Sequence, residues 1–184
     1  MIMNKLRHVL LLVLLLLSSS LYAQPAASAK ARVAEIRKMY AEIQDYRQSL
    51  KTAELPPNEM VITNDYMAAG AGPIHEVYSY YYSGDFDENL DMQVYKVHFI
   101  TRKYNVGARQ FYEELLYNGD GTLAFYYEKG DDGEVRYYFD KGTMIHEIVK
   151  GKDSRKEYDA DMLILHRYAA ELSNAFSLLM NRNY

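Results

Sequence analysis

Two Ile-His-Glu triplets, at residues 74–76 and 145–147, carry the side chains best suited to metal or acid–base chemistry. His146-Glu147 begins like a zinc-protease motif, in which two histidines four residues apart share a helix face. Here Lys150 stands where the second histidine is needed, and both triplets lie in segments with the pattern of strands. Because adjacent strand residues point to opposite faces, a histidine and the glutamate beside it cannot bind one metal. We therefore predict no metal site, since no spacing supports one assembled from His75, His98 and His146.

Other segments that resemble reactive motifs lack residues that the chemistry needs. The acidic run 85–91 opens like a calcium loop, but Leu90 replaces the glycine of its turn and Lys96 replaces its bidentate glutamate. The chain has no cysteine and no Gly-x-Ser-x-Gly nucleophile elbow. The neighbours Glu113 and Glu114 alternate faces on a strand, so neither forms an acid–base pair with the other. We predict no catalytic residue set and no cofactor.

Tyrosine is the compositional oddity, with 19 residues against no tryptophan, and 12 of the 19 lie between Tyr78 and Tyr138. Strand alternation assigns one set of side chains to a core face: Leu123, Phe125, Tyr127, Val135, Tyr137 and Phe139. It assigns Ala124, Tyr126, Arg136 and Tyr138 to the other face. Rings with polar tips beside a cation are typical of binding surfaces, so Tyr126, Arg136 and Tyr138 are the predicted ligand-binding residues. The alternative is that cross-strand tyrosine pairs simply stabilise the sheet.

Tyr126, Arg136 and Tyr138 lie in a repeat. Residues 123–130 (LAFYYEKG) match residues 135–142 (VRYYFDKG) in residue class at seven of eight positions. The repeat resembles the MORN-like family, whose tyrosine- and glycine-punctuated hairpins build long meandering sheets, and the resemblance covers residues 117–151. It implies interaction rather than catalysis. The chain as a whole also resembles secreted Bacteroidetes proteins of helix–sheet–helix design, a group without an assigned activity.

The elements that must position these residues follow from hydrophobic periodicity. Two apolar stripes with helical spacing predict a helix over residues 27–53 and a second helix over 159–181. The first stripe consists of Val33, Ile36, Met39, Tyr40, Ile43, Tyr46 and Leu50, and the second consists of Met162, Leu165, Ala169, Leu172, Phe176 and Leu179. Between them, at 59–150, short alternating segments separated by glycine-rich turns predict about seven strands in an antiparallel meander. The expected fold is a single α+β domain over residues 24–184. Periodicity leaves open which face of the sheet each helix covers.

The start of the chain predicts export. Residues 1–23 have the positive start, the apolar run and the small-residue exit of a secretory signal peptide cleaved near Ala23. The apolar run is too short to cross a membrane, so we expect no transmembrane segment in the mature chain. Without residues 1–23, which contain Lys5 and Arg7, 19 basic and 25 acidic side chains remain, a net charge of −6. This acidic balance argues against a nucleic-acid partner.

Three functions are compatible with the sequence. The favoured one is a secreted or periplasmic, non-enzymatic binding protein that holds a protein or glycan partner on its tyrosine-rich sheet face. The runner-up is a structural envelope protein that forms homo-oligomers through the 27–53 helix. The least favoured is a hydrolase of envelope polymers, with His98 or His146 as acid/base.

Overall fold

The computed structural model describes residues 28–52, 58–154 and 159–181, and the expected signal peptide lies outside them. An N-terminal helix spans residues 28–50, and α2 spans Asp159–Met180. Eight strands run between the helices: β1 (Glu59–Ala68), β2 (Gly72–Asp87), β3 (Met92–Val106), β4 (Arg109–Tyr117), β5 (Leu123–Gly130), β6 (Gly133–Asp140), β7 (Thr143–Val149) and β8 (Lys152–Ser154). This confirms the predicted α+β class and helix–sheet–helix order, with the three-residue β8 added at the end of the meander.

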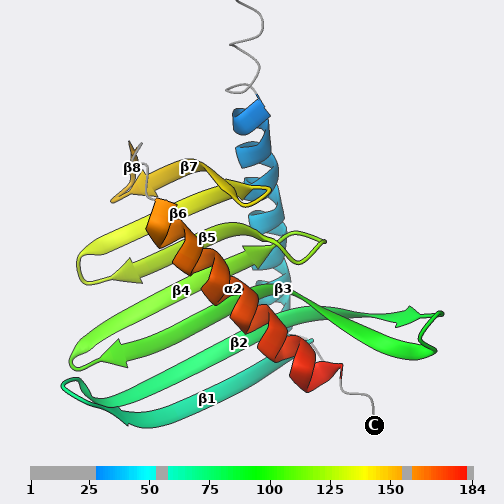
Figure 1. Ribbon diagram of the computed structural model, residues 1–184, viewed down its shortest axis with the longest axis horizontal. Helices are drawn as coiled ribbons and strands as arrows, with labels where there is room; N and C mark the ends of the chain where they lie inside the picture. The colour runs from blue at the N-terminus through cyan, green and yellow to red at the C-terminus, as the bar shows by residue number, and fades with distance from the viewer. Residues whose placement is uncertain (1–27, 53–57, 155–158, 182–184) are drawn as a thin grey trace, which may run out of the picture.

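Every strand pairs antiparallel with the next one along the chain, so the sheet order is β1 to β8 (Figure 1). Short turns make this order possible. Lys141-Gly142 and Lys150-Gly151 are the central residues of two such turns, with φ values of 49° and 79° and of 51° and 76°. Positive φ at both central positions is the geometry whose twist matches a two-residue hairpin, and glycine adopts it at the second position without strain.

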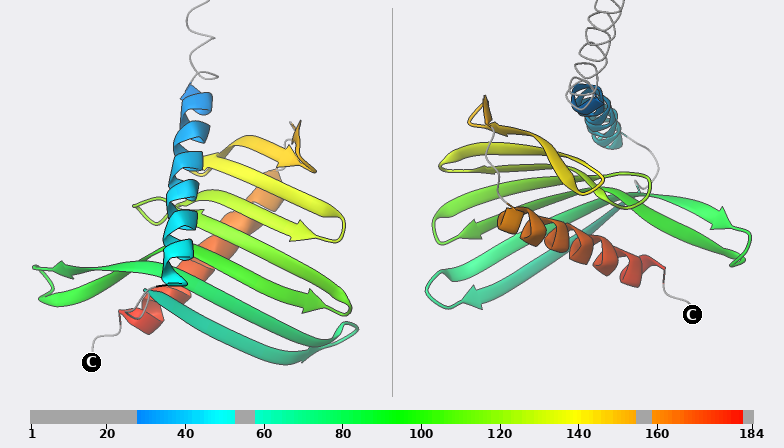
Figure 2. Two further views of the ribbon diagram at one scale, coloured as in Figure 1. Left: turned by 180° about the vertical axis from the view of Figure 1, so that it is seen from behind. Right: turned by 45° about the horizontal axis from the view of Figure 1, so that its top comes forward.

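The two helices lie on opposite faces of the sheet, as the two views of Figure 2 show. The N-terminal helix packs Val33 and Ile36 against Phe99, Leu116 and other buried side chains of one face. All seven residues of its predicted stripe belong to this contact: Val33, Ile36, Met39, Tyr40, Ile43, Tyr46 and Leu50. The sheet is therefore the middle layer of three, and each of its faces has its own hydrophobic core.

The helix α2 covers the second face along most of its predicted stripe. Ala169 and Phe176 are buried, and Met162, Leu165 and Leu172 pack around them. The ring of Phe176 lies against Tyr80 and Tyr82 of β2, with centroid distances of 5.8 and 5.4 Å. Leu179 departs from the prediction, because it lies in the last turn of the helix and is 48% exposed.

The β2–β3 hairpin projects beyond the rest of the sheet (Figures 1 and 2). The pairing of β1 with β2 ends at Tyr81 and the pairing of β4 with β3 ends at Phe99, so residues 83–96 pair only with one another. Asn181, at the end of α2, holds the base of this arm. Its side chain accepts a hydrogen bond from the backbone N–H of Tyr95 at 2.8 Å and donates one to the Tyr95 carbonyl at 2.9 Å.

Replacing Phe176 by alanine tests the packing of α2. Phe176 is fully buried, so its loss removes apolar contacts and leaves a cavity, and we expect the free energy of unfolding to fall by about 3–5 kcal/mol. The matched control is Leu163→Ala on the same helix, where the side chain is 72% exposed and the expected change is within about 0.5 kcal/mol. Urea unfolding followed by circular dichroism measures both. Equal losses in the two variants would contradict this packing.

Candidate functional site

Two neighbouring glutamates of β4, Glu113 and Glu114, form the centre of two polar clusters on opposite faces of the sheet. Each side chain is only 4% exposed. Successive strand residues point to opposite faces, so Glu113 lies towards α2 and Glu114 towards the N-terminal helix. Buried carboxylates need a positive partner or several hydrogen bonds. Each of these glutamates has both, with an arginine and tyrosines around it.

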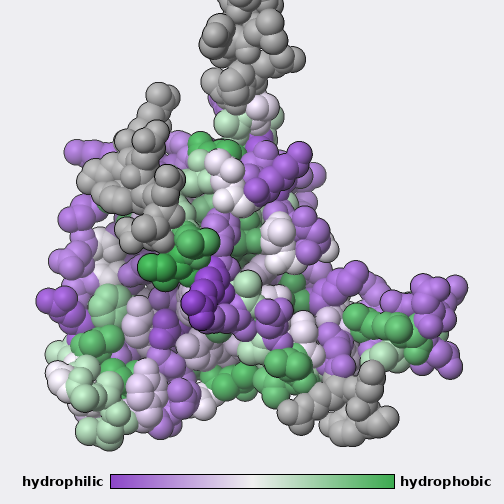
Figure 3. All heavy atoms as spheres, in the orientation of Figure 1, coloured by the Kyte–Doolittle hydropathy of each residue, from purple (hydrophilic) through white to green (hydrophobic). Residues whose placement is uncertain are grey.

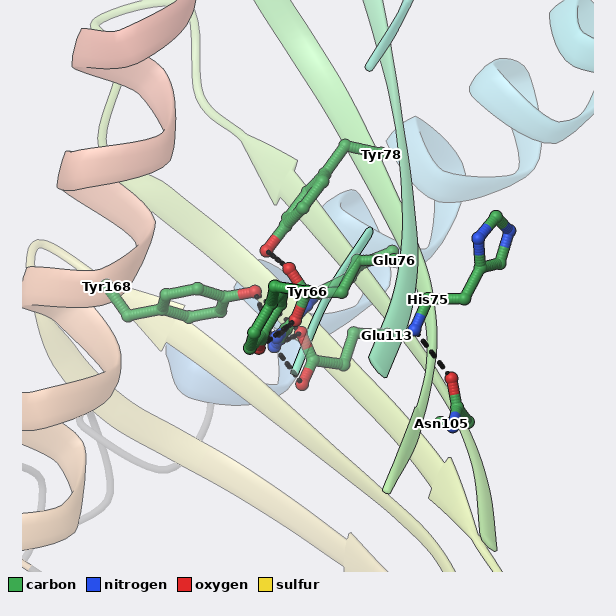
Figure 4. A network of polar contacts seen from close by, with 8 residues as sticks. Tyr66, His75, Glu76, Tyr78, Asn105, Glu113 and Tyr168 are labelled. Atoms are coloured by element: carbon green, nitrogen blue, oxygen red, sulfur yellow. Dashed lines mark hydrogen bonds and ion pairs between the residues drawn. The ribbon is translucent and has the colours of Figure 1, made fainter. Parts of the chain in front are cut away.

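On the α2 face, Arg102 of β3 joins Glu113 to Glu76 of β2. Its Nη2 lies 2.5 Å from Glu76 Oε1, and its Nη1 lies 3.4 Å from Glu113 Oε1. The hydroxyl of Tyr168, on α2, donates to Glu113 Oε2 at 2.7 Å, and that of Tyr78 donates to Glu76 Oε2 at 3.2 Å (Figure 4). We call these five residues the Arg102 cluster. It connects β2, β3, β4 and α2 through charge-assisted hydrogen bonds.

The guanidinium of Arg102 is also surrounded by aromatic rings. It lies 3.9 Å from the ring centroid of Tyr104, 5.4 Å from that of Tyr78 and 5.8 Å from that of Tyr168. These distances are those of cation–π contacts. Burial alone raises the pKa of Glu76, but the hydrogen bond and the charge of Arg102 outweigh it and hold that pKa below its ordinary value. Glu76 and Arg102 are therefore a charged pair at neutral pH.

On the opposite face, Arg47 of the N-terminal helix plays the corresponding part. Its Nη1 lies 3.3 Å from Glu114 Oε1, and its guanidinium stacks over the rings of Tyr81 and Phe99 at 5.1 and 5.2 Å. The hydroxyl of Tyr40 donates to Glu114 Oε2 at 2.5 Å. Two of these groups, Arg47 and Tyr40, come from the helix, so the contacts fix that helix on the sheet.

A cavity of about 310 Å³ lies beside the Arg102 cluster, between α2 and strands β3 to β6. Its polar lining includes the carboxylates of Glu113 and Glu128, and its aromatic lining is formed by Tyr126, Tyr137 and Tyr168. Met162 and Leu165 of α2 add apolar wall. Concave sites with an apolar and aromatic lining and a few converging polar groups are the usual form of small-ligand sites. This cavity is the candidate functional site.

Only one of the three predicted ligand-binding residues lies in this cavity. Tyr126 lines it, and its hydroxyl donates to Glu128 Oε2 at 3.0 Å. Tyr138 is buried on the other face, where Arg37 lies 5.5 Å above its ring. Arg136 is 35% exposed, pairs with Glu134 at 2.8 Å and stacks on Tyr127. The structure does not bring Tyr126, Arg136 and Tyr138 together.

The expectation that these residues share a face is wrong because of the turn between β5 and β6. Gly130 pairs with Gly133 across a two-residue loop, so odd-numbered residues of one strand pair with even-numbered residues of the other. Tyr126 is thus opposite Tyr137, and Arg136 is opposite Tyr127. The prediction assumed that equivalent positions of the 12-residue repeat point to the same face of the sheet. Because 12 is even, this assumption places the odd-numbered residues of both strands on one face. An antiparallel turn of this length reverses that assignment.

The histidines also occupy separate environments. Nδ1 of His75 lies 2.6 Å from Asp65 Oδ1 on the exposed surface, and Nε2 of His98 lies 2.7 Å from Ser83 Oγ at the base of the projecting hairpin. The ring of His146 lies 5.4 Å from that of Tyr138. Burial lowers the pKa of His98. Within residues 28–52, 58–154 and 159–181, no three histidine, aspartate or glutamate side chains come together as metal ligands would.

The Arg102 cluster was not identified from the sequence. One signal was present: Glu76, Arg102 and Glu113 each stand inside a segment that alternates like a strand, where a charged side chain on a covered face requires a partner. The sequence cannot supply the identity of those partners. They come from other strands and a helix, and residues that bond directly are up to 66 positions apart, as with Arg102 and Tyr168.

Comparison with known proteins adds no relative: no family model, no curated protein and no solved structure matches the chain. The part of the chain that the structure describes contains no helix with both the length and the apolar character needed to span a membrane. The geometry of the site is therefore the basis for its function.

Nitration distinguishes the buried tyrosines from the exposed ones. Tyr126 and Tyr138 are 6% and 5% exposed, whereas Tyr66 on β1 is 44% exposed. We expect tetranitromethane to modify Tyr66 well before either buried ring, as mapped by mass spectrometry of the folded protein. Prior unfolding in urea should remove the difference. Early modification of Tyr126 and Tyr138 together would place both rings on an open surface and contradict the layer arrangement.

The tyrosines should also make the protein sensitive to alkali. Eleven of the described tyrosines, all buried or half-buried, have a pKa raised chiefly by that burial: Tyr40, Tyr78, Tyr80, Tyr81, Tyr82, Tyr104, Tyr112, Tyr117, Tyr126, Tyr127 and Tyr168. For Tyr80 the pKa rises to about 12. Above the ordinary tyrosine pKa of about 10, the unfolded chain loses phenolic protons that the folded chain keeps, so stability must fall as the pH rises.

We therefore expect the melting temperature to stay level up to pH of about 9 and to drop steeply above about 10. Phenolate absorbance at 295 nm should appear together with the loss of circular dichroism. Ionisation of most tyrosines near their ordinary pKa, in a protein that stays folded, would contradict the described burial.

Proposed function

We propose that this chain is an exported, non-enzymatic binding protein whose ligand site is the cavity beside the Arg102 cluster. Export rests on the signal-peptide pattern of residues 1–23. The site rests on the cavity, which is lined by Tyr126 together with Glu113, Glu128, Tyr137 and Tyr168, whereas Arg136 and Tyr138 lie outside it.

The main support for this proposal is an excess of negative charge at the cavity. Among the described residues of the cavity and the Arg102 cluster there are three carboxylates, Glu76, Glu113 and Glu128, and one cation, Arg102. Three negative charges and one positive charge leave a balance of −2. Glu76 and Glu113 already share Arg102, whereas within the described part of the chain the Glu128 carboxylate accepts a hydrogen bond only from the hydroxyl of Tyr126. A positively charged ligand would restore the balance.

The aromatic lining favours the same class of ligand. Tyrosine ring faces attract cations within about 6 Å, and Arg102 already uses this contact inside the cluster. An ammonium or guanidinium group in the cavity would have Glu128 as a hydrogen-bond acceptor and Tyr126, Tyr137 and Tyr168 as ring neighbours. The proposed ligand is therefore an organic cation, either a small amine or a basic side chain of a protein partner. A neutral glycan would use the rings but not the charge.

The two other functions expected from the sequence have less support. The apolar stripe of the N-terminal helix packs on the sheet of its own chain, so that stripe is not free to join a second copy. Ser83 and His98 bring a hydroxyl and an imidazole within 2.7 Å, but no described carboxylate hydrogen-bonds to His98 as the third member of a triad. Neither observation favours a structural oligomer through that helix or a hydrolase.

Titration calorimetry with agmatine and choline tests the proposal. We expect both cations to bind the wild-type protein. Glu128→Gln should weaken agmatine binding about tenfold, which corresponds to one lost hydrogen bond to a charged group of ~1.5 kcal/mol. It should also weaken the binding of choline, whose quaternary ammonium has no N–H, through loss of the carboxylate charge alone. Glutamine keeps an acceptor for Tyr126 but removes the charge.

The matched control is Glu134→Gln in the same β5–β6 hairpin. Glu134 pairs with Arg136 and accepts from Tyr127 on the opposite face, so this variant should bind like wild type. Chitotriose serves as the neutral probe. If chitotriose bound and the two cations did not, or if both glutamine variants bound equally well, the cation site would be wrong.

A further inference from the structure

Within the described residues, the sheet has a long free edge at β1, which does not line the cavity. All ten residues of β1 pair with β2 in one unbroken register, from Glu59 opposite Tyr81 to Ala68 opposite Gly72. No strand within the described residues pairs with the other side of β1 (Figure 1). The opposite edge of the sheet is β8, which is only three residues long.

Apart from the charges of Glu59 and Asp65, β1 lacks the features within a strand that normally prevent one sheet from pairing with another. Protective features include lysine or proline in the edge strand, a β-bulge or a very short strand. The sequence of β1, EMVITNDYMA, has neither lysine nor proline, and its pairing shows no register shift. Its exposed side chains include Val61, Tyr66 and Met67, which are 55%, 44% and 76% exposed. An edge of this length and composition favours addition of another strand.

The outward-facing backbone groups of β1 can be assigned. The N–H of Tyr82 donates to the carbonyl of Asn58 at 3.1 Å, so Asn58 and Tyr82 form a hydrogen-bonded pair at the start of the ladder. In an antiparallel pair, hydrogen-bonded positions alternate along the strand. Even-numbered residues of β1 therefore bond to β2. The N–H and C=O groups that point to the free edge belong to Glu59, Val61, Thr63, Asp65 and Met67.

We propose that β1 pairs antiparallel with β1 of a second copy, about a two-fold axis perpendicular to the sheet that passes by Asn64. Such an axis keeps the α2 face next to the α2 face and joins odd residues to odd residues, as the outward backbone groups require. Val61 then pairs with the partner's Met67, and Thr63 pairs with the partner's Asp65. The two meanders become one continuous sheet, and the contact is isologous.

The side chains of β1 fit this register. On one face, Ile62 lies opposite the partner's Tyr66, and on the other, exposed Val61 lies opposite exposed Met67. The carboxylate of Asp65 faces a threonine hydroxyl and not another acid. Centring the axis on Thr63 instead would place Asp65 opposite Val61 and Met67 opposite Glu59, which mismatches polar and apolar partners. The register centred on Asn64 is therefore the one proposed.

A cysteine at the axis tests this register directly, because the chain contains no other cysteine. In the proposed pair, Asn64 and the partner's Asn64 are a non-hydrogen-bonded pair, with Cα atoms about 4.5 Å apart, which is within disulfide range. We expect Asn64→Cys to form a covalent dimer under mild oxidation of the exported chain. Asn174→Cys, on the exposed side of α2, is the matched control and should remain monomeric on a non-reducing gel.

Sedimentation velocity tests the backbone pairing without a cross-link. The wild-type protein should dimerise as concentration rises, and Thr63→Pro should stay monomeric because proline removes an outward N–H while leaving the β2 ladder intact. Thr63→Val keeps that N–H and should dimerise. Met67→Lys adds an edge charge without changing the backbone, so it should be monomeric even if the proline variant fails to fold.

The proposal is overturned if the wild type is monomeric at every concentration, if Asn64→Cys does not cross-link, or if Met67→Lys dimerises like wild type. Because β1 does not line the cavity, binding of agmatine and choline should be unchanged in Met67→Lys. The two proposals can therefore fail separately.

Discussion

The burial of two adjacent carboxylates on one central strand is the constraint on which the rest of the structure depends. Glu113 and Glu114 point to opposite faces of β4, so each requires its own counter-charge in its own core. Arg102 and Tyr168 satisfy the first, and Arg47 and Tyr40 satisfy the second. These contacts connect both helices to the same strand. These polar contacts fix the position of each helix on the sheet, because apolar packing is non-directional and would by itself allow either helix to shift along the sheet.

Each face of β4 has a buried glutamate paired with an arginine, but the helices cover the two faces to different extents. The Glu114 side is covered by the N-terminal helix, which itself supplies Arg47 and Tyr40. On the Glu113 side, α2 crosses the strands and leaves a cavity beside its contact with Arg102. The surface near α2 mixes apolar and hydrophilic patches, and a further apolar patch lies on the projecting hairpin, where Phe86 and Leu90 are exposed (Figure 3). The proposed ligand cavity therefore lies on the α2 face of the sheet.

A meander of this kind leaves two edges, and their lengths differ. The β8 end is short, whereas β1 presents ten residues with alternate backbone groups free. The two helices protect the faces of the sheet but do not add to either edge. Met60 and Ile62 of β1 pack on the core of the α2 face, and Tyr66 donates a hydrogen bond to Glu76 of the Arg102 cluster, but β1 does not line the cavity. The proposed binding at the cavity and the proposed pairing at β1 therefore use different residues.

The sequence by itself determined the class of the fold, the order of its elements and their approximate bounds. Periodicity identified the stripes that contain Ile36 and Phe176, and glycine-rich turns such as Lys141-Gly142 required a meander, because these signals are local. Only the tertiary structure decided which face each tyrosine occupies. The two-residue turn between β5 and β6 placed Tyr126 and Tyr138 on opposite faces, and the cavity brought Tyr168 of α2 to Arg102 and Glu113 of the neighbouring strands β3 and β4. Register and long-range pairing depend on contacts between elements, which no local pattern contains.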